Sequence, residues 1–168
     1  MHSVLERYTA AMEKDKEVLP IKLVCFDLDD TLIAQNSSEK LNQALGMTPA
    51  EDYKMYVAYK NGKINYDEWT NRIERIWHER GLATREHIAN ILHDYVFVND
   101  AEVVVAALQT RGYDTALLTG SFNSLAEVVA NDLGIDRYFG CAQLSYDNNG
   151  DFKTLSTQGD EATAKREQ

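Results

Sequence analysis

The chain has 168 residues, 44% of them hydrophobic and 26% charged, which is enough for one globular domain with a buried core. Its net charge of −10 argues against nucleic acid or an anionic membrane surface as the main partner, because both bind clusters of Lys and Arg. No apolar run approaches the ~20 residues that span a bilayer, and the charged N-terminus lacks a signal peptide's apolar stretch, so we expect no membrane partner and a cytoplasmic location.

The N-terminal region predicts a helix followed by a strand. Residues 2–17 carry apolar side chains at helical spacing among charges, and Pro20 ends that segment. Residues 21–26 form a short, mostly apolar run rich in strand formers, which predicts a buried strand. Cys25 and Cys141 lie far apart in apolar surroundings, so we interpret both as small buried hydrophobic residues.

Residues 36–99 have a helical pattern throughout. Thr48 and Glu51 form a capping box that opens a helix, and that helix ends near Gly62. A second helix carries an apolar stripe that includes Trp69 and Trp77, and a third begins after Thr84. We interpret these stripes as core packing, because apolar stripes at helical spacing usually face a core.

Strands and helices alternate after residue 99. A helix over 100–111 is expected to bury Val104, Val105 and Leu108. The remaining expected elements, in chain order, are a strand at 113–118, a turn at 119–121, a helix at 122–133, a strand at 141–146, a hairpin turn at 147–151 and a short strand near 152–155. This alternation predicts an α/β fold, a doubly wound, Rossmann-like parallel sheet with right-handed crossovers.

Two acidic residues follow the first strand directly. Asp27 and Asp29 are two positions apart, so in extended chain their carboxylates face the same side. One could act as a nucleophile and the other as a general acid and base, and a divalent cation such as Mg²⁺ would offset their repulsion. In isolation, however, an Asp-x-Asp pair more often caps a helix or lies in a solvated turn.

The surrounding segment, residues 24–32, resembles the first signature of the haloacid dehalogenase superfamily, an apolar strand followed by Asp-x-Asp-x-Thr. The resemblance implies that Asp27 attacks phosphorus to form an aspartyl-phosphate. It implies that Asp29 protonates the leaving oxygen, later deprotonates the attacking water, and contributes its backbone carbonyl to a Mg²⁺ ion bound with Asp27. The expected partner is a small phosphorylated substrate.

Two further segments resemble later signatures of that family. Residues 117–121 end in Thr119, Gly120 and Ser121, which the resemblance assigns to binding the phosphoryl oxygens. Lys165 resembles the lysine that neutralises the phosphate and the nucleophile. Alone, each has a simpler interpretation: a turn that caps a helix, and a surface lysine.

Similarity to the phosphoserine-phosphatase-like branch covers nearly the whole chain from Ile21 onward. It implies a helical cap at 36–98 inserted into a core of 1–35 and 99–168, with Arg72 close to a substrate-contacting arginine of the cap. The glutamate that reads the amino group of phosphoserine is replaced here by Asn36. Another small phosphomonoester is therefore equally compatible with the sequence.

The fourth signature of the family, a Gly-Asp-x-x-x-Asp segment that supplies a further carboxylate to Mg²⁺, has no counterpart before Gln168. We therefore expect either a truncated form or a short relative with an impaired metal site. Three functions remain open: a phosphomonoester hydrolase, a phosphotransferase, or a catalytically impaired binding or scaffold protein. The sequence does not indicate the oligomeric state.

Overall fold

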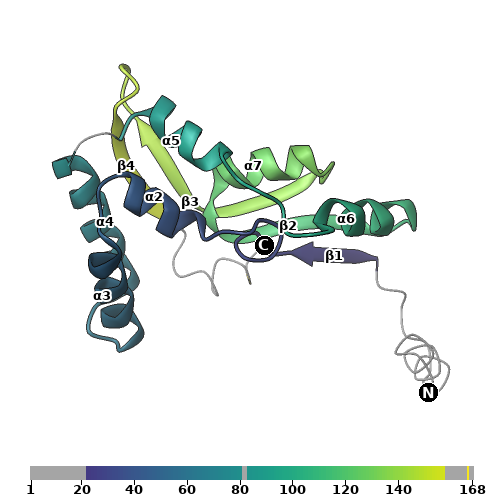
Figure 1. The fold of residues 1–168 in the computed structure, drawn as a ribbon, viewed down its shortest axis with the longest axis horizontal. Coiled ribbons are helices and arrows are strands. Elements are labelled where there is room, and N and C mark those ends of the chain that lie inside the picture. The colour runs from purple at the N-terminus through teal and green to yellow at the C-terminus, as the bar shows by residue number, and fades with distance from the viewer. Residues whose placement is uncertain (1–21, 81–82, 158–165, 167–168) are drawn as a thin grey trace.

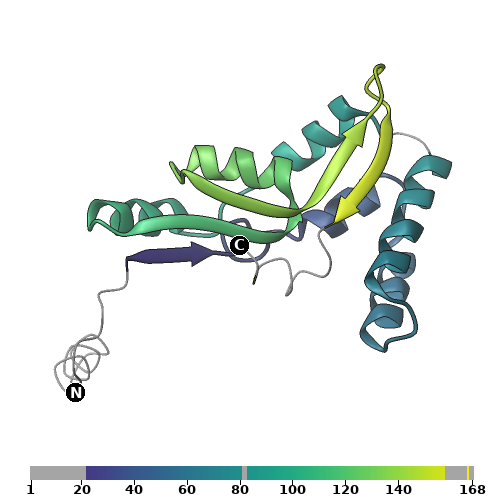
Figure 2. The same cartoon turned by 180° about the vertical axis from the view of Figure 1, so that it is seen from behind.

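The computed structural model describes residues 22–80, 83–157 and 166, so the helix predicted over 2–17 lies outside the described residues. Within these residues, four strands form one sheet in the order β1-β2-β3-β4 (Figure 1, Figure 2). They are β1 (Leu23–Phe26), β2 (Asp114–Phe122), β3 (Arg137–Tyr146) and β4 (Phe152–Thr157). The first three are parallel, and β4 returns antiparallel to β3. The expected α/β class is confirmed in the form of a mixed, mostly parallel sheet with helices.

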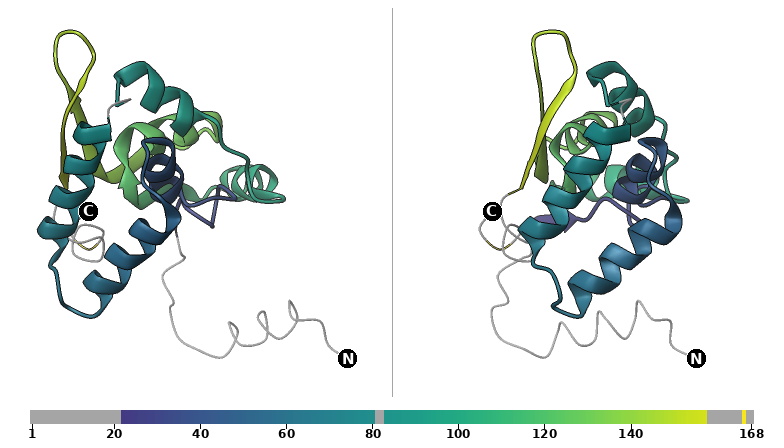
Figure 3. Two further views of the ribbon diagram at one scale, coloured as in Figure 1. Left: turned by 60° about the vertical axis from the view of Figure 1, so that its left-hand side comes forward. Right: turned by 90° about the vertical axis from the view of Figure 1, so that its left-hand side faces the viewer.

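Helices fill the segment between β1 and β2, as predicted. Between these strands lie α2 (Ser37–Ala44), α3 (Pro49–Lys60), α4 (Tyr66–Arg80), α5 (Arg85–His93) and α6 (Ala101–Thr110), and α7 (Asn123–Asp132) follows β2. Helix α2 contacts β2 and α5, and α5 contacts α7, so both belong to the packed body around the sheet. Helix α4 contacts β4, and α3 and α4 form a helical pair whose far end extends away from the sheet (Figure 3). No helix within the described ranges has the length and apolar character to cross a bilayer.

Trp77 joins this projecting helical pair to the sheet. Its side chain is 1% exposed, and its ring lies 5.3 Å from that of Phe152 on β4 and 6.4 Å from that of Phe122 on β2. Its indole N–H donates to Oδ1 of Asn42 on α2 at 3.2 Å. One buried side chain therefore fixes α4 against both the sheet and α2, at the side of the sheet where β2 ends.

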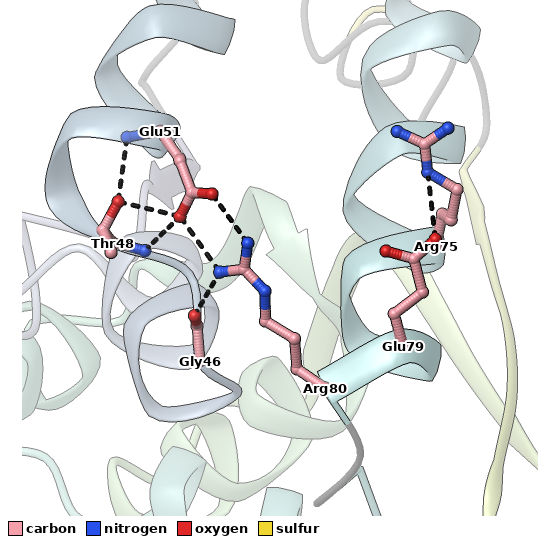
Figure 4. A network of polar contacts seen from close by, with 6 residues as sticks. All are labelled: Gly46, Thr48, Glu51, Arg75, Glu79 and Arg80. Carbon is pink, nitrogen blue, oxygen red and sulfur yellow. Dashed lines mark hydrogen bonds and ion pairs between the residues drawn. The ribbon is translucent and has the colours of Figure 1, made fainter.

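A polar network holds the start of α3 against the end of α4 (Figure 4). The predicted capping box is present: Thr48 Oγ1 accepts from the Glu51 amide at 3.3 Å, and Glu51 accepts from the Thr48 amide at 2.8 Å. Arg80 donates to both carboxylate oxygens of Glu51, at 2.6 and 3.0 Å, and to the carbonyl of Gly46. The Arg80 guanidinium, with Thr48, holds the pKa of Glu51 well below its usual range. Arg75 forms a separate ion pair with Glu79 within α4.

Strand β1 is less buried than the sequence predicts. Leu23 is 43% exposed and Cys25 is also exposed, whereas Cys141 on β3 is buried as expected. The prediction of a buried β1 and a buried Cys25 was therefore wrong. Among the described residues β1 pairs only with β2, so its other edge is open, and nearby apolar side chains have no neighbouring strand to cover them.

Two local predictions around β2 also need correction. Residues 119–121 are not a turn: β2 stays extended to Phe122, because Phe122 pairs with Ala142 of β3 after a register shift. On α6, Val105 is 1% exposed as predicted, but Val104 is 48% exposed. The helix presents only a narrow face to β2, and Val104 lies outside it.

Gly140 of β3 lies directly against the start of α7, so this position has no room for a side chain. A Cβ at this position would lie 2.4 Å from Cα and 2.5 Å from N of Asn123, both backbone atoms that cannot move aside. We expect Gly140→Ala to lower the free energy of unfolding by about 2–3 kcal/mol, measured by urea denaturation. Gly62→Ala is the control: its φ of +66° strains a new side chain but the space is open, so about 1 kcal/mol is expected. Equal costs for the two variants would contradict the steric argument.

Candidate active site

The parallel pairing of β1 with β2 brings the two predicted signatures side by side. Phe26 pairs with Leu117, so Asp27 follows the end of β1 just where Thr119 lies on β2. Asp27 and Asp29 line the same cavity as Thr119, Gly120 and Ser121, and the cavity has a volume of about 730 Å³. This size is typical of a small-molecule site, and the position, outside the carboxyl ends of parallel strands, is where such sheets bind ligands.

The turn after β1 explains why both acids face this cavity. Leu28, between them, is fully buried, and its carbonyl accepts from the amides of Thr31, Leu32 and Ile33 at 2.9–3.2 Å. Burial of one leucine thus directs its two neighbours the other way, toward solvent and the cavity. The next residue, Asp30, has a φ of +55° and also lines the cavity.

Asp29 is held by a serine that the sequence analysis did not single out. Ser37, fully buried at the start of α2, donates its amide to Oδ1 and its hydroxyl to Oδ2 of Asp29, both at 2.9 Å. Ser37 Oγ is also hydrogen-bonded to the hydroxyl of Ser121, and either hydroxyl can be the donor. The sequence feature that could have indicated this serine is its place directly after Asn36. The Asn36 side chain accepts from the Glu39 amide at 2.9 Å and caps α2.

Burial raises the pKa of Asp29 above its ordinary value. The two hydrogen bonds from Ser37 oppose this effect, and the negative charges of Asp27 and Asp30 add to it. A carboxyl group with a raised pKa holds its proton more readily, which suits a general acid. The two carboxyl groups therefore have different surroundings. Asp29 is held by two hydrogen bonds from Ser37, whereas Asp27 accepts a hydrogen bond from the Leu28 amide at 2.9 Å.

The acidic group at the end of β1 suits a hard cation. Within the described ranges, no set of three or more His, Cys, Asp or Glu side chains is arranged to hold a metal ion. However, Mg²⁺ commonly binds one or two protein carboxylates and completes its shell with water and substrate phosphate oxygens. Asp27 and Asp29 line one cavity with oxygen donors of this kind, so these residues fit such an ion.

The other predicted site residues have different placements. Thr119 and Ser121 are buried at 1% and 4% exposure, and Thr119 Oγ1 accepts from the Ser121 amide at 3.1 Å. The Ser121 hydroxyl belongs to the network around Asp29 through Ser37. The structure does not bring Arg72 to this cavity: Arg72 lines a second hollow between α3 and α4. Lys165 lies outside the described residues.

Comparison with known proteins identifies the family. The model of the haloacid dehalogenase-like hydrolases matches residues 21–166, so the chain belongs to this family. A probable phosphoserine phosphatase of Schizosaccharomyces pombe is 29% identical over 138 residues, covering 82% of this chain and 45% of that protein. A phosphoserine phosphatase of Archaeoglobus fulgidus is 27% identical over 119 residues, covering 71% and 33%. The chain is thus a distant homologue of the phosphoserine-phosphatase-like branch and spans about half the length of these relatives or less.

Solved structures agree with this fold. A substrate-bound phosphoserine phosphatase superposes with a TM-score of 0.66 at 20% identity, covering 86% of this chain and 65% of that one. A haloacid dehalogenase family hydrolase from Salmonella enterica superposes with a TM-score of 0.68 at 14% identity, covering 95% and 56%. At these identities the likeness establishes the fold.

The raised pKa of Asp29 predicts a stability effect that depends on pH. Folding favours the protonated form of Asp29. This group therefore stabilises the folded state at pH values below its pKa in the unfolded chain, and that stabilisation is lost as pH rises through its pKa in the folded chain. We expect Asp29→Asn to raise the free energy of unfolding at pH 7 by roughly 0.5–2 kcal/mol, and to raise it less as pH falls toward 4. Urea denaturation at both pH values measures this, with Asp114→Asn, at the exposed start of β2, as the control. A loss of stability at pH 7 would contradict the assignment.

Proposed function

We propose that this chain carries the nucleophile site of a Mg²⁺-dependent phosphomonoester hydrolase that acts through an aspartyl-phosphate. The observation that carries the proposal is the single cavity into which the acidic end of β1 and the hydroxyl-bearing end of β2 open. Membership in the haloacid dehalogenase-like hydrolases supports it. The proposal includes the doubly wound core, the helical segment 36–98 as a cap over the site, and a small phosphorylated metabolite as substrate.

In the first step, a carboxylate oxygen of Asp27 attacks phosphorus and the bond from phosphorus to the ester oxygen breaks. The leaving alkoxide takes the proton that Asp29 holds, so the alcohol departs neutral. The burial of Asp29 and the raised pKa that follows from it support this role, since the acid must be protonated when the substrate binds. Ser37 keeps the carboxyl group oriented through its amide and its hydroxyl.

In the second step, water attacks phosphorus of the aspartyl-phosphate. Asp29, now a carboxylate, accepts the proton of that water, and the bond between phosphorus and Asp27 breaks to release inorganic phosphate. We infer that the Thr119 hydroxyl and the Gly120 amide bind phosphoryl oxygens, since both residues line the same cavity. Asp27 and the backbone carbonyl of Asp29 would hold Mg²⁺, which offsets negative charge on the phosphate when bound.

Phosphate release from a panel of small phosphomonoesters, with and without Mg²⁺, tests the proposal. Asp27→Asn should lower the rate by at least about 10³-fold, because the amide is not a nucleophile in this reaction. Asp114→Asn is the matched control: the same substitution on an exposed residue at the far end of β2 should leave the rate unchanged.

Three outcomes would contradict the proposal. Release that survives Asp27→Asn would remove Asp27 as the nucleophile. A folded wild-type chain that binds phosphate esters in the presence of Mg²⁺ and never turns them over would favour a binding or scaffold protein instead. Release only when an alcohol is added as acceptor would indicate a phosphotransferase with the same intermediate.

A further inference from the structure

Four aromatic side chains form one wall of the cavity that holds the acidic residues. We call Tyr56, Tyr59, Tyr66 and Trp69, from the end of α3 and the start of α4, the aromatic cluster. The Trp69 ring centroid lies 4.8 Å from that of Tyr59, 6.0 Å from that of Tyr66 and 6.3 Å from that of Tyr56. Asp27 and Asp29 line the same cavity, so the cluster lies where the non-phosphate part of a substrate would extend.

The aromatic cluster is not simply the interior of the helical pair. Met55 of α3, Trp77 of α4 and Ile64 in the connection between the two helices are buried, whereas Tyr56 is 44% exposed and Trp69 is half-buried. The interpretation of Trp69 as core packing was therefore wrong. Its indole N–H is buried, and among the described residues nothing accepts its hydrogen bond.

The charges around the cluster favour a cation. Glu39 of α2 and Asp52 of α3 line the cavity, and within the described ranges neither forms an ion pair. Burial and the neighbouring Glu39 raise the pKa of Asp52, as expected where carboxylates gather without a counter-charge. Lys60 is the one basic residue among the described cavity lining, and its ammonium lies 5.5 Å over the ring of Tyr56. A ring face of the cluster thus already attracts an ammonium group.

We propose that the aromatic cluster, with Glu39 and Asp52, binds an ammonium group carried by the leaving alcohol of the substrate. The inference rests on the proposed function and narrows its substrate class to aminoalkyl phosphates, above all those with a quaternary ammonium group. Ring faces attract such a group, and the two carboxylates add charge attraction from α2 and α3. The Asn36 side chain caps α2, so we expect the aromatic cluster, and not this position, to bind the cation in this chain.

Binding of the alcohol alone tests the subsite without phosphate, Mg²⁺ or turnover. Choline and its neutral isostere 3,3-dimethylbutan-1-ol have the same shape and differ in charge. In ligand-detected NMR titrations of the full chain, choline should bind about tenfold more tightly than the isostere. Asp27→Asn should leave choline binding intact while it abolishes phosphate release, which separates failure of the subsite from failure of the proposed hydrolase.

Three variants sharpen the test. Trp69→Leu should weaken choline binding about tenfold, and Tyr113→Leu, remote from the cavity, should leave it unchanged. Lys60→Gln changes an exposed side chain, so folding is preserved, and it should tighten choline binding about threefold because it removes a like charge and frees the Tyr56 ring. This gain in affinity cannot arise from damage to the fold.

The proposal is overturned if the isostere binds as tightly as choline, since the cavity would then select shape alone. It is also overturned if Lys60→Gln weakens choline binding and 3-hydroxypropionate outcompetes choline, because Lys60 would then bind a carboxylate of the substrate. Hydrolysis with no preference for phosphocholine over 3,3-dimethylbutyl phosphate would leave the hydrolase standing and remove the subsite. Choline binding without hydrolysis would leave the subsite standing and remove the proposed hydrolase.

Discussion

The parallel pairing of β1 with β2 is the constraint on which the site depends. Phe26 faces Leu117 in the register, so the chain leaves β1 as an acidic segment beside Thr119 and its neighbours on β2. Burial of Leu28 then fixes the orientation of the turn, because the leucine can reach the core only if Asp27 and Asp29 point to the cavity. A shift of this register by one residue would send the carboxylates to the opposite side. The geometry is therefore set by packing and backbone pairing, and the chemistry follows from it.

Electrostatics shows the cost of this arrangement. Asp27, Asp29 and Asp30 line one cavity, and two carboxylates 4 Å apart repel each other by about 4 kcal/mol at an effective dielectric of 20. The chain offsets part of this cost locally, since Ser37 gives Asp29 two hydrogen bonds. In our proposals, bound groups offset the rest of this repulsion: a cation at Asp27 and Asp29, and an ammonium group at the aromatic cluster. Sites that store such repulsion commonly trade stability for activity.

Much of the fold follows from local sequence patterns, and the misses follow from tertiary contacts. The capping box of Thr48 and Glu51, the helices of the inserted segment and the β3–β4 hairpin depend on neighbours in the chain, and all were predicted. Exposure of β1 could not be predicted, because it depends on which strands flank it. The extended course of residues 119–121 arises from pairing with β3, and Ser37 reaches Asp29 only through folding. Trp69 and Trp77 share one helical stripe, yet only Trp77 is fully buried, because α4 extends beyond the sheet (Figure 3).

The central claim is that Asp27 becomes covalently phosphorylated, and chemical trapping tests it most directly. Borohydride reduces an aspartyl-phosphate to homoserine, so the full chain would be mixed with a phosphomonoester and Mg²⁺, quenched with borohydride, and mapped by peptide mass spectrometry. We predict homoserine at position 27, dependent on substrate and Mg²⁺, with Asp29 and Asp30 unmodified. Phosphate release without any trapped residue, or trapping at another aspartate, would contradict the account.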